Sequence, residues 1–326
     1  MASPQGMIFD IIRGTTHDGP GVRTTLFLKG CSLRCRWCQN PESIRPRQEI
    51  WWDKARCIGC MACLDACAKG ALTWKTGRPC ISKSSCSLCM QCIQTCPAKA
   101  LTVIGQEWTL ERTAAEILKD KEYMVALGGG LTVSGGEPLE QPDFLNALFQ
   151  RMRREGIHTA LDTSGMADWK SLEKVLPHTD CVLYDLKHID PATHAQLTGK
   201  SNDVILGNLM CIADYIRHEG KTNGRNMTLW IRTPLVPGAT VAVCNLAGIG
   251  TFIHKHLGDV VQRWELCAFN KACVNKYHKL GTSWFYEKEE LLTQKELHDI
   301  RQGLAASGIS PERYVVTGLV SEKGSA

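Results

Sequence analysis

Three cysteines, Cys31, Cys35 and Cys38, stand on a loop directly after the apolar run of residues 21–28. Thiolates at such short spacing are typical ligands of iron–sulfur clusters, and zinc is the other metal that takes them. Three thiolates on a four-iron cluster leave one iron open to substrate or cofactor atoms, whereas clusters with four cysteine ligands only carry electrons. The spacing therefore predicts an iron–sulfur cluster that takes part in chemistry, with a zinc site or three unconnected loop cysteines as the alternatives.

A second group of cysteines forms an internal duplication. The run CIGCMACLDACAKGAL, residues 57–72, recurs as CSLCMQCIQTCPAKAL, residues 86–101, with the cysteines in register. Each half has the spacing of two-cluster bacterial ferredoxins, in which the fourth cysteine of one run ligates the other cluster. That rule assigns one cluster to Cys57, Cys60, Cys63 and Cys96, and the other to Cys86, Cys89, Cys92 and Cys67. A zinc ribbon, the alternative, would need only two CxxC pairs and would leave the other thiols unexplained.

A glycine-rich segment, Ser134-Gly135-Gly136-Glu137-Pro138, follows the apolar residues 131–133. Paired glycines let a backbone approach a ligand closely, and a neighbouring carboxylate can receive an amino group. A plain glycine turn is the alternative. The position of the segment at the end of an expected strand favours a binding role.

The elements that must position these loops follow from hydrophobic periodicity. Apolar and β-branched runs predict strands at residues 21–28, 131–134, 158–163, 181–187, 227–235, 262–269 and 313–317. Amphipathic patterns predict helices at residues 110–122, 143–155, 208–217, 246–256 and 294–306. Strands that alternate with helices at this spacing indicate a parallel sheet, as a barrel or partial barrel, and function in such folds lies where strands end.

The composition is that of a globular α/β protein. The chain has 326 residues, 44% of them hydrophobic and 22% charged, enough for one large domain plus a smaller module. Its 17 cysteines are spaced as metal ligands and not as a secreted disulfide scaffold. Asp10 and Arg13 interrupt the early apolar run, and prolines and glycines interrupt the uncharged run 233–253, which argues against a secretion signal and a membrane span. The net charge of +5 includes no run of like charges and does not indicate nucleic-acid binding.

Several motifs together resemble one enzyme family. The stretch 17–25 (HDGPGVRTT), the cysteine triplet and the Gly-Gly-Glu segment have counterparts, in the same order, in the activating enzymes of glycyl radical enzymes. These are relatives of the pyruvate formate-lyase activase within the radical S-adenosylmethionine superfamily. Further counterparts are residues 161–165 (LDTSG), 184–187 (YDLK), 230–232 (WIR) and 236–238 (VPG), so the similarity spans nearly the whole chain. The duplicated segment is similar to the subgroup that carries two extra clusters.

The resemblance implies a fold, a domain division and cofactors. We expect a partial parallel (β/α) barrel of the radical S-adenosylmethionine type, residues 1–49 and 106–326, with an inserted ferredoxin-like 2[4Fe–4S] domain, residues 50–105. Three [4Fe–4S] clusters, S-adenosylmethionine and a monovalent cation are implied. The implied activity is reductive cleavage of S-adenosylmethionine to methionine and a 5′-deoxyadenosyl radical, which takes a hydrogen atom from a backbone glycine of a partner enzyme.

The resemblance also implies roles for residues at matching positions. Cys31, Cys35 and Cys38 are the implied catalytic cluster ligands. Implied cofactor contacts come from Trp37, Cys38, Gln39, Gly135, Gly136, Glu137, Asp162, Asp185, Leu186, Lys187, Arg232 and Asn270. Lys187 resembles the cation that holds the cofactor carboxylate. Asp162, Thr163 and Asp185 resemble a monovalent-cation site, and Asp18 and Arg23 resemble residues that receive the partner's glycine loop.

The chain departs from the family pattern near its last strands. Where the family often has Leu-Pro-Tyr-His, this chain has Cys267-Ala268-Phe269-Asn270. Asn270 can still form hydrogen bonds to the adenosine end of the cofactor, but it carries no proton. Cys80, outside both cysteine motifs, merits a test as a substitute cluster ligand.

The implied partners are a glycyl radical enzyme as protein substrate and reduced flavodoxin or ferredoxin as electron donor, with no nucleic acid and no membrane. We expect a cytoplasmic monomer. Two rival functions stay open from sequence: a radical enzyme that acts on its own small molecule, and an iron–sulfur electron-transfer protein. The first predicts deoxyadenosine formation that depends on that molecule, and the second predicts clusters without cleavage of S-adenosylmethionine.

Overall fold

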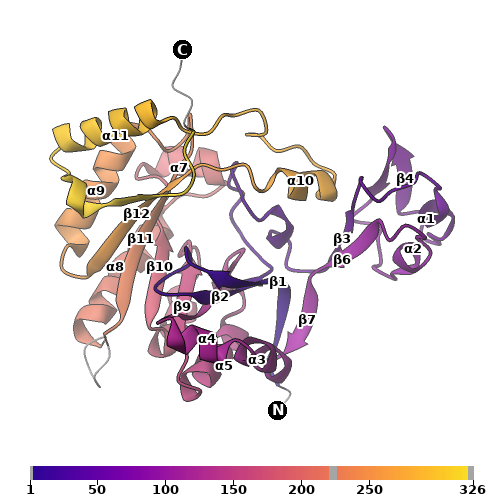
Figure 1. Cartoon of the computed structure of the whole chain (residues 1–326), viewed down its shortest axis with the longest axis horizontal. Coiled ribbons are helices and arrows are strands. Elements are labelled where there is room, and N and C mark those ends of the chain that lie inside the picture. Colours follow the sequence, from indigo (N-terminus) through magenta and orange to yellow (C-terminus); the bar gives the residue numbers. More distant parts are fainter. Residues whose placement is uncertain (1–2, 220–225, 322–326) are drawn as a thin grey trace.

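The main element of the fold is a nine-stranded sheet in the order β13-β12-β11-β10-β9-β8-β2-β1-β7 (Figure 1). The computed structural model describes residues 3–219 and 226–321. The strands are β1 (Gln5–Thr15), β2 (Arg23–Leu28), β7 (Gln106–Thr109), β8 (Gly130–Gly135), β9 (His158–Thr163), β10 (Cys181–Asp185), β11 (Thr228–Leu235), β12 (Val261–Ala268) and β13 (Val315–Thr317). Neighbours from β2 to β13 are parallel, whereas β1 is antiparallel to β2 and β7. The predicted parallel α/β architecture is therefore confirmed. Within the described residues the sheet is open, with β13 and β7 as its edges.

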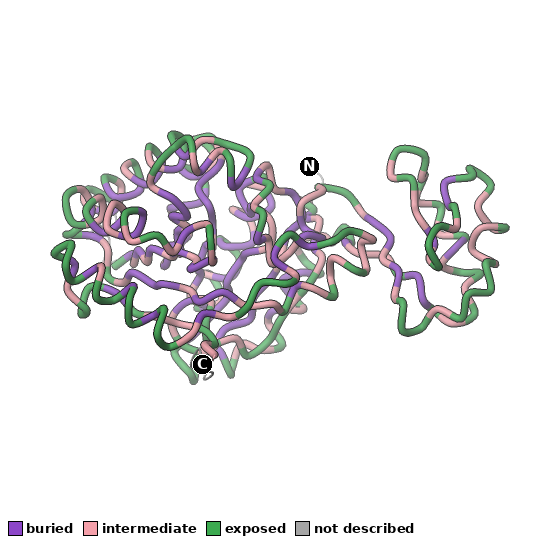
Figure 2. The backbone as a smooth tube through the Cα atoms, turned by 90° about the horizontal axis from the view of Figure 1, so that it is seen from above, coloured by how far each residue is buried: buried purple, intermediate pink, exposed green. Residues whose placement is uncertain are grey.

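Helices follow the parallel strands, and most of them cover one side of the curved sheet (Figure 1). They are α3 (Leu110–Leu118), α4 (Lys121–Ala126), α5 (Pro142–Arg154), α6 (Trp169–Val175), α7 (Pro191–Thr198), α8 (Asp203–His218), α9 (Val243–Leu257), α10 (Val274–Leu280) and α11 (Gln294–Ala306). Of these, α10 lies away from the sheet (Figure 1). The apolar face of α5 is fully buried against the sheet, as its spacing of apolar residues predicts. Figure 2 shows the result as a continuous buried interior beneath an exposed layer of helices and loops.

The predicted helix at residues 110–122 is wrong, because the segment forms two helices. The break falls at Asp120, whose carboxylate accepts hydrogen bonds from the Arg13 guanidinium and the Thr24 hydroxyl, both at 2.9 Å. These bonds tie the start of α4 to the β1–β2 hairpin. This contact is tertiary, so the local pattern of apolar residues did not predict the break.

A smaller unit projects from one end of the large sheet (Figure 1). It contains β3 (Glu49–Trp52) paired with β6 (Leu101–Ile104), β4 (Leu72–Lys75) paired with β5 (Arg78–Ile81), and the short helices α1 (Ala62–Asp65) and α2 (Gln91–Gln94). Its halves share a detail of backbone: Met61 and Met90 precede the two helices with φ of 59° and 66°. The unit buries its own apolar cluster around Trp52, Leu72 and Leu101, apart from the main core. The duplication seen in sequence is thus also a duplication of local structure.

Within the part of the chain that the structure describes, every helix is too short or too polar to span a membrane.

One glycine at the end of β9 gives a test of the core. Gly165 has φ +70°, and a Cβ atom there would lie 1.7 Å from the hydroxyl of Tyr184, which is fully buried. We expect Gly165→Ala to lower the free energy of unfolding by about 3 kcal/mol, because left-handed strain adds to overpacking. Urea denaturation measures the loss. Gly156→Ala is the control: its φ is +74° with no atom within 4 Å of the added Cβ, so it should lose only about 1 kcal/mol. Equal losses in the two variants would contradict the packing argument.

Candidate iron–sulfur and cofactor site

A cavity of about 300 Å³ lies where β8, β9, β10, β11 and β12 end. Of the residues singled out from sequence, its lining contains Cys31, Cys35, Trp37, Cys38, Gln39, Gly135, Gly136, Asp162, Thr163, Asp185, Lys187, Arg232 and Asn270. Four of the residues expected to contact the cofactor or the partner loop are absent from it: Asp18, Arg23, Glu137 and Leu186. The fold therefore gathers most of the expected site from segments that are far apart in sequence.

The loop with the three cysteines is held by backbone hydrogen bonds. The amide of Cys31 donates to the carbonyl oxygen of Ile44 at 3.2 Å, and the amide of Arg34 donates to that of Thr198 at 2.7 Å. The carbonyl oxygen of Cys38 accepts a hydrogen bond from the Tyr277 hydroxyl at 3.0 Å. The loop is thus positioned from three directions, by residues 41–46, by the end of α7 and by α10.

The three thiols share one buried environment. Burial raises the pKa of the Cys31 thiol to about 12, and it also raises the pKa values of Cys35 and Cys38. Such thiols stay protonated at neutral pH, so metal binding has to release their protons. Among the described residues, no three His, Cys, Asp or Glu converge on a point that would hold a single metal ion. A four-iron cluster binds each thiolate through a different iron, so three thiols on one cavity wall fit it without such convergence.

Two buried cations face the carboxylates of the cavity. The Lys187 ammonium group contacts the Asp185 carboxylate, and the Arg232 guanidinium lies 3.3 Å from Asp162 and 3.5 Å from Glu265. Burial lowers the pKa of Lys187, but the charge of the Asp185 carboxylate and the hydrogen bond to it outweigh burial and keep the pKa above its usual value. Lys187 is therefore a permanent positive charge in the cavity.

The surroundings of Asp162 have opposing effects on the pKa of its carboxyl group. Burial raises its pKa to about 6, and the neighbouring Asp185 acts in the same direction, while the Arg232 guanidinium acts against both. The hydroxyl of Ser134 donates a hydrogen bond to the Asp162 carboxylate at 2.6 Å. Ser134, at the end of β8, thus joins the Gly-Gly-Glu segment to the neighbouring strand.

The carboxylate of Glu137 does not reach the cavity, contrary to its expected cofactor contact. It is fully buried and accepts hydrogen bonds from the Thr163 hydroxyl at 2.6 Å and from the amide and hydroxyl of Ser164 at 2.9 and 2.6 Å. The backbone of Gly135 and Gly136 lines the cavity instead. A Cβ at Gly136 would lie 2.2 Å from the carbonyl oxygen of Gly30, so this close approach of two loops requires glycine.

Asp18 and Arg23 lie beside β2 and β8, outside the lining of the cavity. The Arg23 side chain is completely buried, and its guanidinium donates to Thr132 at 2.5 Å, to the Pro20 carbonyl oxygen at 2.9 Å and to the Leu131 carbonyl oxygen at 2.7 Å. It cannot contact a partner directly in this arrangement. Its hydrogen bond to the Pro20 carbonyl oxygen supports the turn that carries Asp18, so any effect of Arg23 on a partner passes through that turn.

The cysteines of the projecting unit lie close to one another. A small cavity is lined by Cys57, Cys60, Cys63 and Cys96. After burial itself, the thiols that raise the pKa of Cys92 are Cys86, Cys63, Cys67 and Cys89. All of these cysteines are free of disulfides. The cavity thus combines three cysteines of the first half with the last cysteine of the second, whereas Cys92 has neighbouring thiols from both halves.

Comparison with known proteins identifies the chain. Residues 17–206 match the family model described as a 4Fe-4S single cluster domain. The (2S)-3-sulfopropanediol dehydratase activating enzyme of Klebsiella oxytoca is 40% identical over 86% of this chain and 86% of its own length. The indoleacetate decarboxylase activating enzyme of Tractidigestivibacter scatoligenes is 35% identical over 94% of this chain and 96% of its own length.

The chain belongs to the activating enzymes of glycyl radical enzymes. It is an enzyme that uses a [4Fe–4S] cluster with S-adenosylmethionine, and its partner is a glycyl radical enzyme. The family favours this activity over the two rival functions. Among solved structures, a domain of the pyruvate-formate lyase-activating enzyme from Bacteroides vulgatus ATCC 8482 matches with a TM-score of 0.44 and 24% identity, over 58% of this chain and 99% of that one.

Several residues around the site of this activating enzyme were not foreseen. Lys276 and Tyr277 on α10 contact the cysteine loop: the Lys276 ammonium donates to the Asn40 side chain at 2.7 Å and pairs with Glu42 at 2.8 Å. Cys267 and Phe269 line the cavity, and Phe269 stacks on Trp284 with ring centroids 5.5 Å apart. Residues 270–291 carry no helical or strand periodicity in sequence, so no local pattern indicated that they cover the cysteine loop.

Proposed function

We propose that Cys31, Cys35 and Cys38 hold the catalytic [4Fe–4S] cluster and that the cavity beside them binds S-adenosylmethionine. The observation that carries this assignment is the convergence of three thiols, two buried cations and a glycine backbone on one cavity at the strand ends. When bound, the cluster supplies one electron that cleaves S-adenosylmethionine to methionine and a 5′-deoxyadenosyl radical, which removes a hydrogen atom from a glycine of the partner. The other roles belong to the residues of this chain.

Lys187 binds the carboxylate of the methionyl group. It lines the same cavity as the three cysteines, and burial strengthens an ion pair formed there. The backbone of Gly135 and Gly136 is suited to receive the amino group, because it lines the cavity and neither glycine has a side chain. Glu137 is a positioning residue, which holds the end of β9 against the Gly-Gly segment.

Asp162, Thr163 and Asp185 provide oxygen atoms at adjacent strand ends for a monovalent cation. Arg232 and Lys187 already share these carboxylates, so a bound cation would compete with them for the same oxygens. Asn270 lies at the opposite side of the cavity, where its carbonyl oxygen accepts a hydrogen bond from Gln39 at 3.3 Å. This position supports contacts of Gln39, Trp37 and Asn270 with the adenosine end.

An aromatic layer shields this end of the cavity from water. Trp37, Phe269, Trp284 and Tyr286 are each buried and pack into one cluster. A radical formed in the cavity is protected from side reactions when water is excluded. The layer comes from the cysteine loop and residues 269–286, so it closes over the same thiols that hold the cluster.

Residues 50–105 are proposed as a ferredoxin-like domain with two further [4Fe–4S] clusters, inserted into a catalytic domain of residues 1–49 and 106–326. The separate apolar cluster of the projecting unit and its two cysteine groups support this division. Reduced flavodoxin or ferredoxin is the proposed electron donor. We propose a cytoplasmic monomer.

An anaerobic activation assay tests the proposed function. The reduced, cluster-loaded protein is mixed with S-adenosylmethionine and the glycyl radical enzyme encoded nearest to its gene. We expect a glycyl radical doublet in the EPR spectrum, matched in amount by deoxyadenosine. Deoxyadenosine that appears only with an added small molecule, or no deoxyadenosine from cluster-loaded protein, would contradict the proposal.

A further inference from the structure

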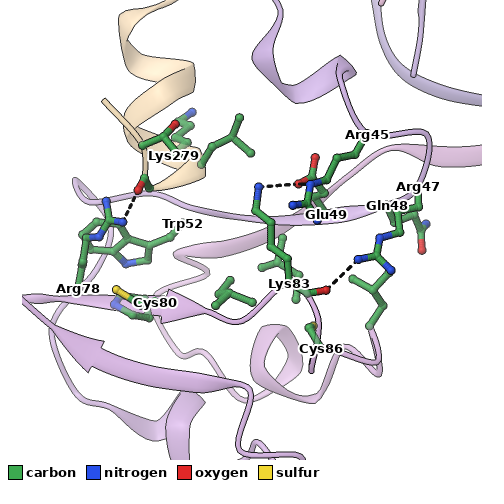
Figure 3. Close-up of a pocket in the computed structure, with 17 residues that line it drawn as sticks. Arg45, Arg47, Gln48, Glu49, Trp52, Arg78, Cys80, Lys83, Cys86 and Lys279 are labelled. Carbon is green, nitrogen blue, oxygen red and sulfur yellow. Dashed lines mark hydrogen bonds and ion pairs between the residues drawn. The ribbon is translucent and has the colours of Figure 1, made fainter. Parts of the chain in front are cut away.

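A second cavity, of about 250 Å³, lies between the projecting unit and the end of α10 (Figure 3). Three segments build it: residues 45–52, residues 78–88 and residues 279–282. Its walls include the apolar side chains of Trp52 and Leu88. Five basic residues line it, namely Arg45, Arg47, Arg78, Lys83 and Lys279. None of these residues belongs to the cofactor site described above.

The cations of this cavity outnumber its carboxylates. Glu49 is the only acidic residue in the lining, and its carboxylate is already shared by Lys83 at 2.9 Å, Lys29 at 3.3 Å and Arg45 at 3.4 Å. Arg47 donates to the carbonyl oxygen of Lys83 at 2.8 Å, and Arg78 donates to that of Gly281. Neither guanidinium forms an ion pair within residues 3–219 and 226–321. The cavity therefore has an excess of positive charge that favours an anionic partner.

The cavity is also close to the proposed redox centres. Cys86, one of the cysteines of the second ferredoxin-like group, is part of its lining. On the opposite wall, Lys279 and Leu280 belong to α10, and one turn earlier on the same helix Tyr277 donates its hydroxyl hydrogen to the carbonyl oxygen of Cys38. An anionic group in the cavity would thus lie against an insert cysteine and against the helix that contacts the catalytic cysteine loop.

We propose that this basic cavity docks an acidic one-electron carrier protein, whose surface carboxylates pair with Arg47 and Arg78. The inference rests on the proposed function, since it assigns the entry point for the electron that this function needs. In the step, the reduced carrier loses one electron and the iron–sulfur centre held by Cys86 gains it, and no bond is made or broken. Charge of one sign on a concave surface raises the rate of encounter with a partner of opposite charge. A free carrier could therefore recognise this surface before the partner enzyme is bound.

The test uses reduced flavodoxin as the carrier and the cluster-loaded full chain. Stopped-flow bleaching of the iron–sulfur absorption gives the second-order rate constant of reduction. We expect Arg47→Glu with Arg78→Glu to lower this constant about tenfold at low ionic strength, with a smaller difference in high salt. Calorimetric titration with oxidised flavodoxin should show a matching loss of affinity. Arg154→Glu with Lys170→Glu, two exposed residues on α5 and α6, is the matched control and should change neither quantity.

A small cationic reductant separates docking from damage. Reduced methyl viologen is a cation and does not need the basic docking surface, so its rate should not fall in the Arg47→Glu, Arg78→Glu protein. Because charge reversal could disturb folding, the milder pair Arg47→Gln with Arg78→Gln is measured too, and it should lose part of the flavodoxin rate alone. Unchanged reduction by flavodoxin, or equal losses with both reductants in both pairs, would overturn the proposal. A loss of affinity for the partner enzyme, with the affinity for flavodoxin unchanged, would also overturn the proposal.

Failure of the docking proposal is distinct from failure of the proposed function. Cleavage of S-adenosylmethionine with methyl viologen as electron source depends on the catalytic site and not on Arg47 or Arg78. If the wild-type chain cleaves S-adenosylmethionine under these conditions and the flavodoxin rate is unaffected by the substitutions, only the docking surface is wrong.

Discussion

Replacing Cys31, Cys35 and Cys38 together with alanine is expected to reduce deoxyadenosine formation to background. The three thiols line one cavity, and they are the proposed ligands that leave one iron open to S-adenosylmethionine. Because the insert cysteines belong to a separate unit with its own apolar cluster, their clusters should survive the substitutions. Iron content should therefore fall by about one third, while an EPR signal from the reduced insert clusters persists.

Two exposed cysteines provide the control for this triple variant. Cys211 on α8 and Cys244 on α9 are exposed and lie outside the cofactor cavity. The Cys211→Ala, Cys244→Ala protein should keep full iron content and full cleavage activity. Deoxyadenosine formation by the triple variant would exclude the assignment, and loss of all iron from it would contradict the expected independence of the insert clusters. The second result would mean that the insert clusters depend on the catalytic loop for their stability.

The sequence predicted those parts of the fold that local patterns determine. The predicted strand 158–163 and the predicted helix 294–306 agree with β9 and α11 at both ends. The start of α11 is well specified because Thr293 and Glu296 form reciprocal hydrogen bonds there. Four of the six residues of β9 are buried, as expected for a parallel strand covered on both faces.

The sequence motifs did not predict the directions in which the side chains of the site point. The Gly-Gly-Glu segment is where it was expected, yet the Glu137 carboxylate points to Thr163 and Ser164. Arg23 occupies its expected position at the start of β2, but its donors are taken by Thr132 and by backbone carbonyl groups. Both outcomes depend on hydrogen-bond partners on neighbouring strands. Those partners are distant in sequence, so spacing alone carries no information about them.

Helix α10 is a whole secondary-structure element that the local sequence did not predict. It has seven residues and no buried side chain of its own to produce an amphipathic pattern. Its importance comes from tertiary contacts, since it reaches the catalytic loop through Tyr277 and the projecting unit through Lys279, which lies 3.8 Å from Asp53. A segment of this kind is recognised only when the elements that it joins are already in place.

Lys187→Met is expected to weaken the binding of S-adenosylmethionine about 30-fold or more. Loss of one partner from a buried, hydrogen-bonded charge pair costs roughly 2 kcal/mol or more, and 1.4 kcal/mol corresponds to a factor of ten. The Lys187 side chain is only 9% exposed, so water replaces its charge poorly. Equilibrium binding to the cluster-loaded protein measures the effect. The exposed Lys200 provides the control, because Lys200→Met removes the same charge outside the cavity.

The double variant Lys187→Met, Asp185→Asn distinguishes a binding role of Lys187 from a structural one. Lys187→Met alone leaves the Asp185 carboxylate without the ammonium group that it contacts, and this unpaired charge should lower the free energy of unfolding. Adding Asp185→Asn removes the charge, so stability in urea should recover. If Lys187 holds the carboxylate of S-adenosylmethionine, binding should stay weak in the double variant, since the missing cation is not restored. Recovery of binding together with stability would mean that Lys187 only neutralises Asp185, and the cation that holds the cofactor would then have to be sought at Arg232.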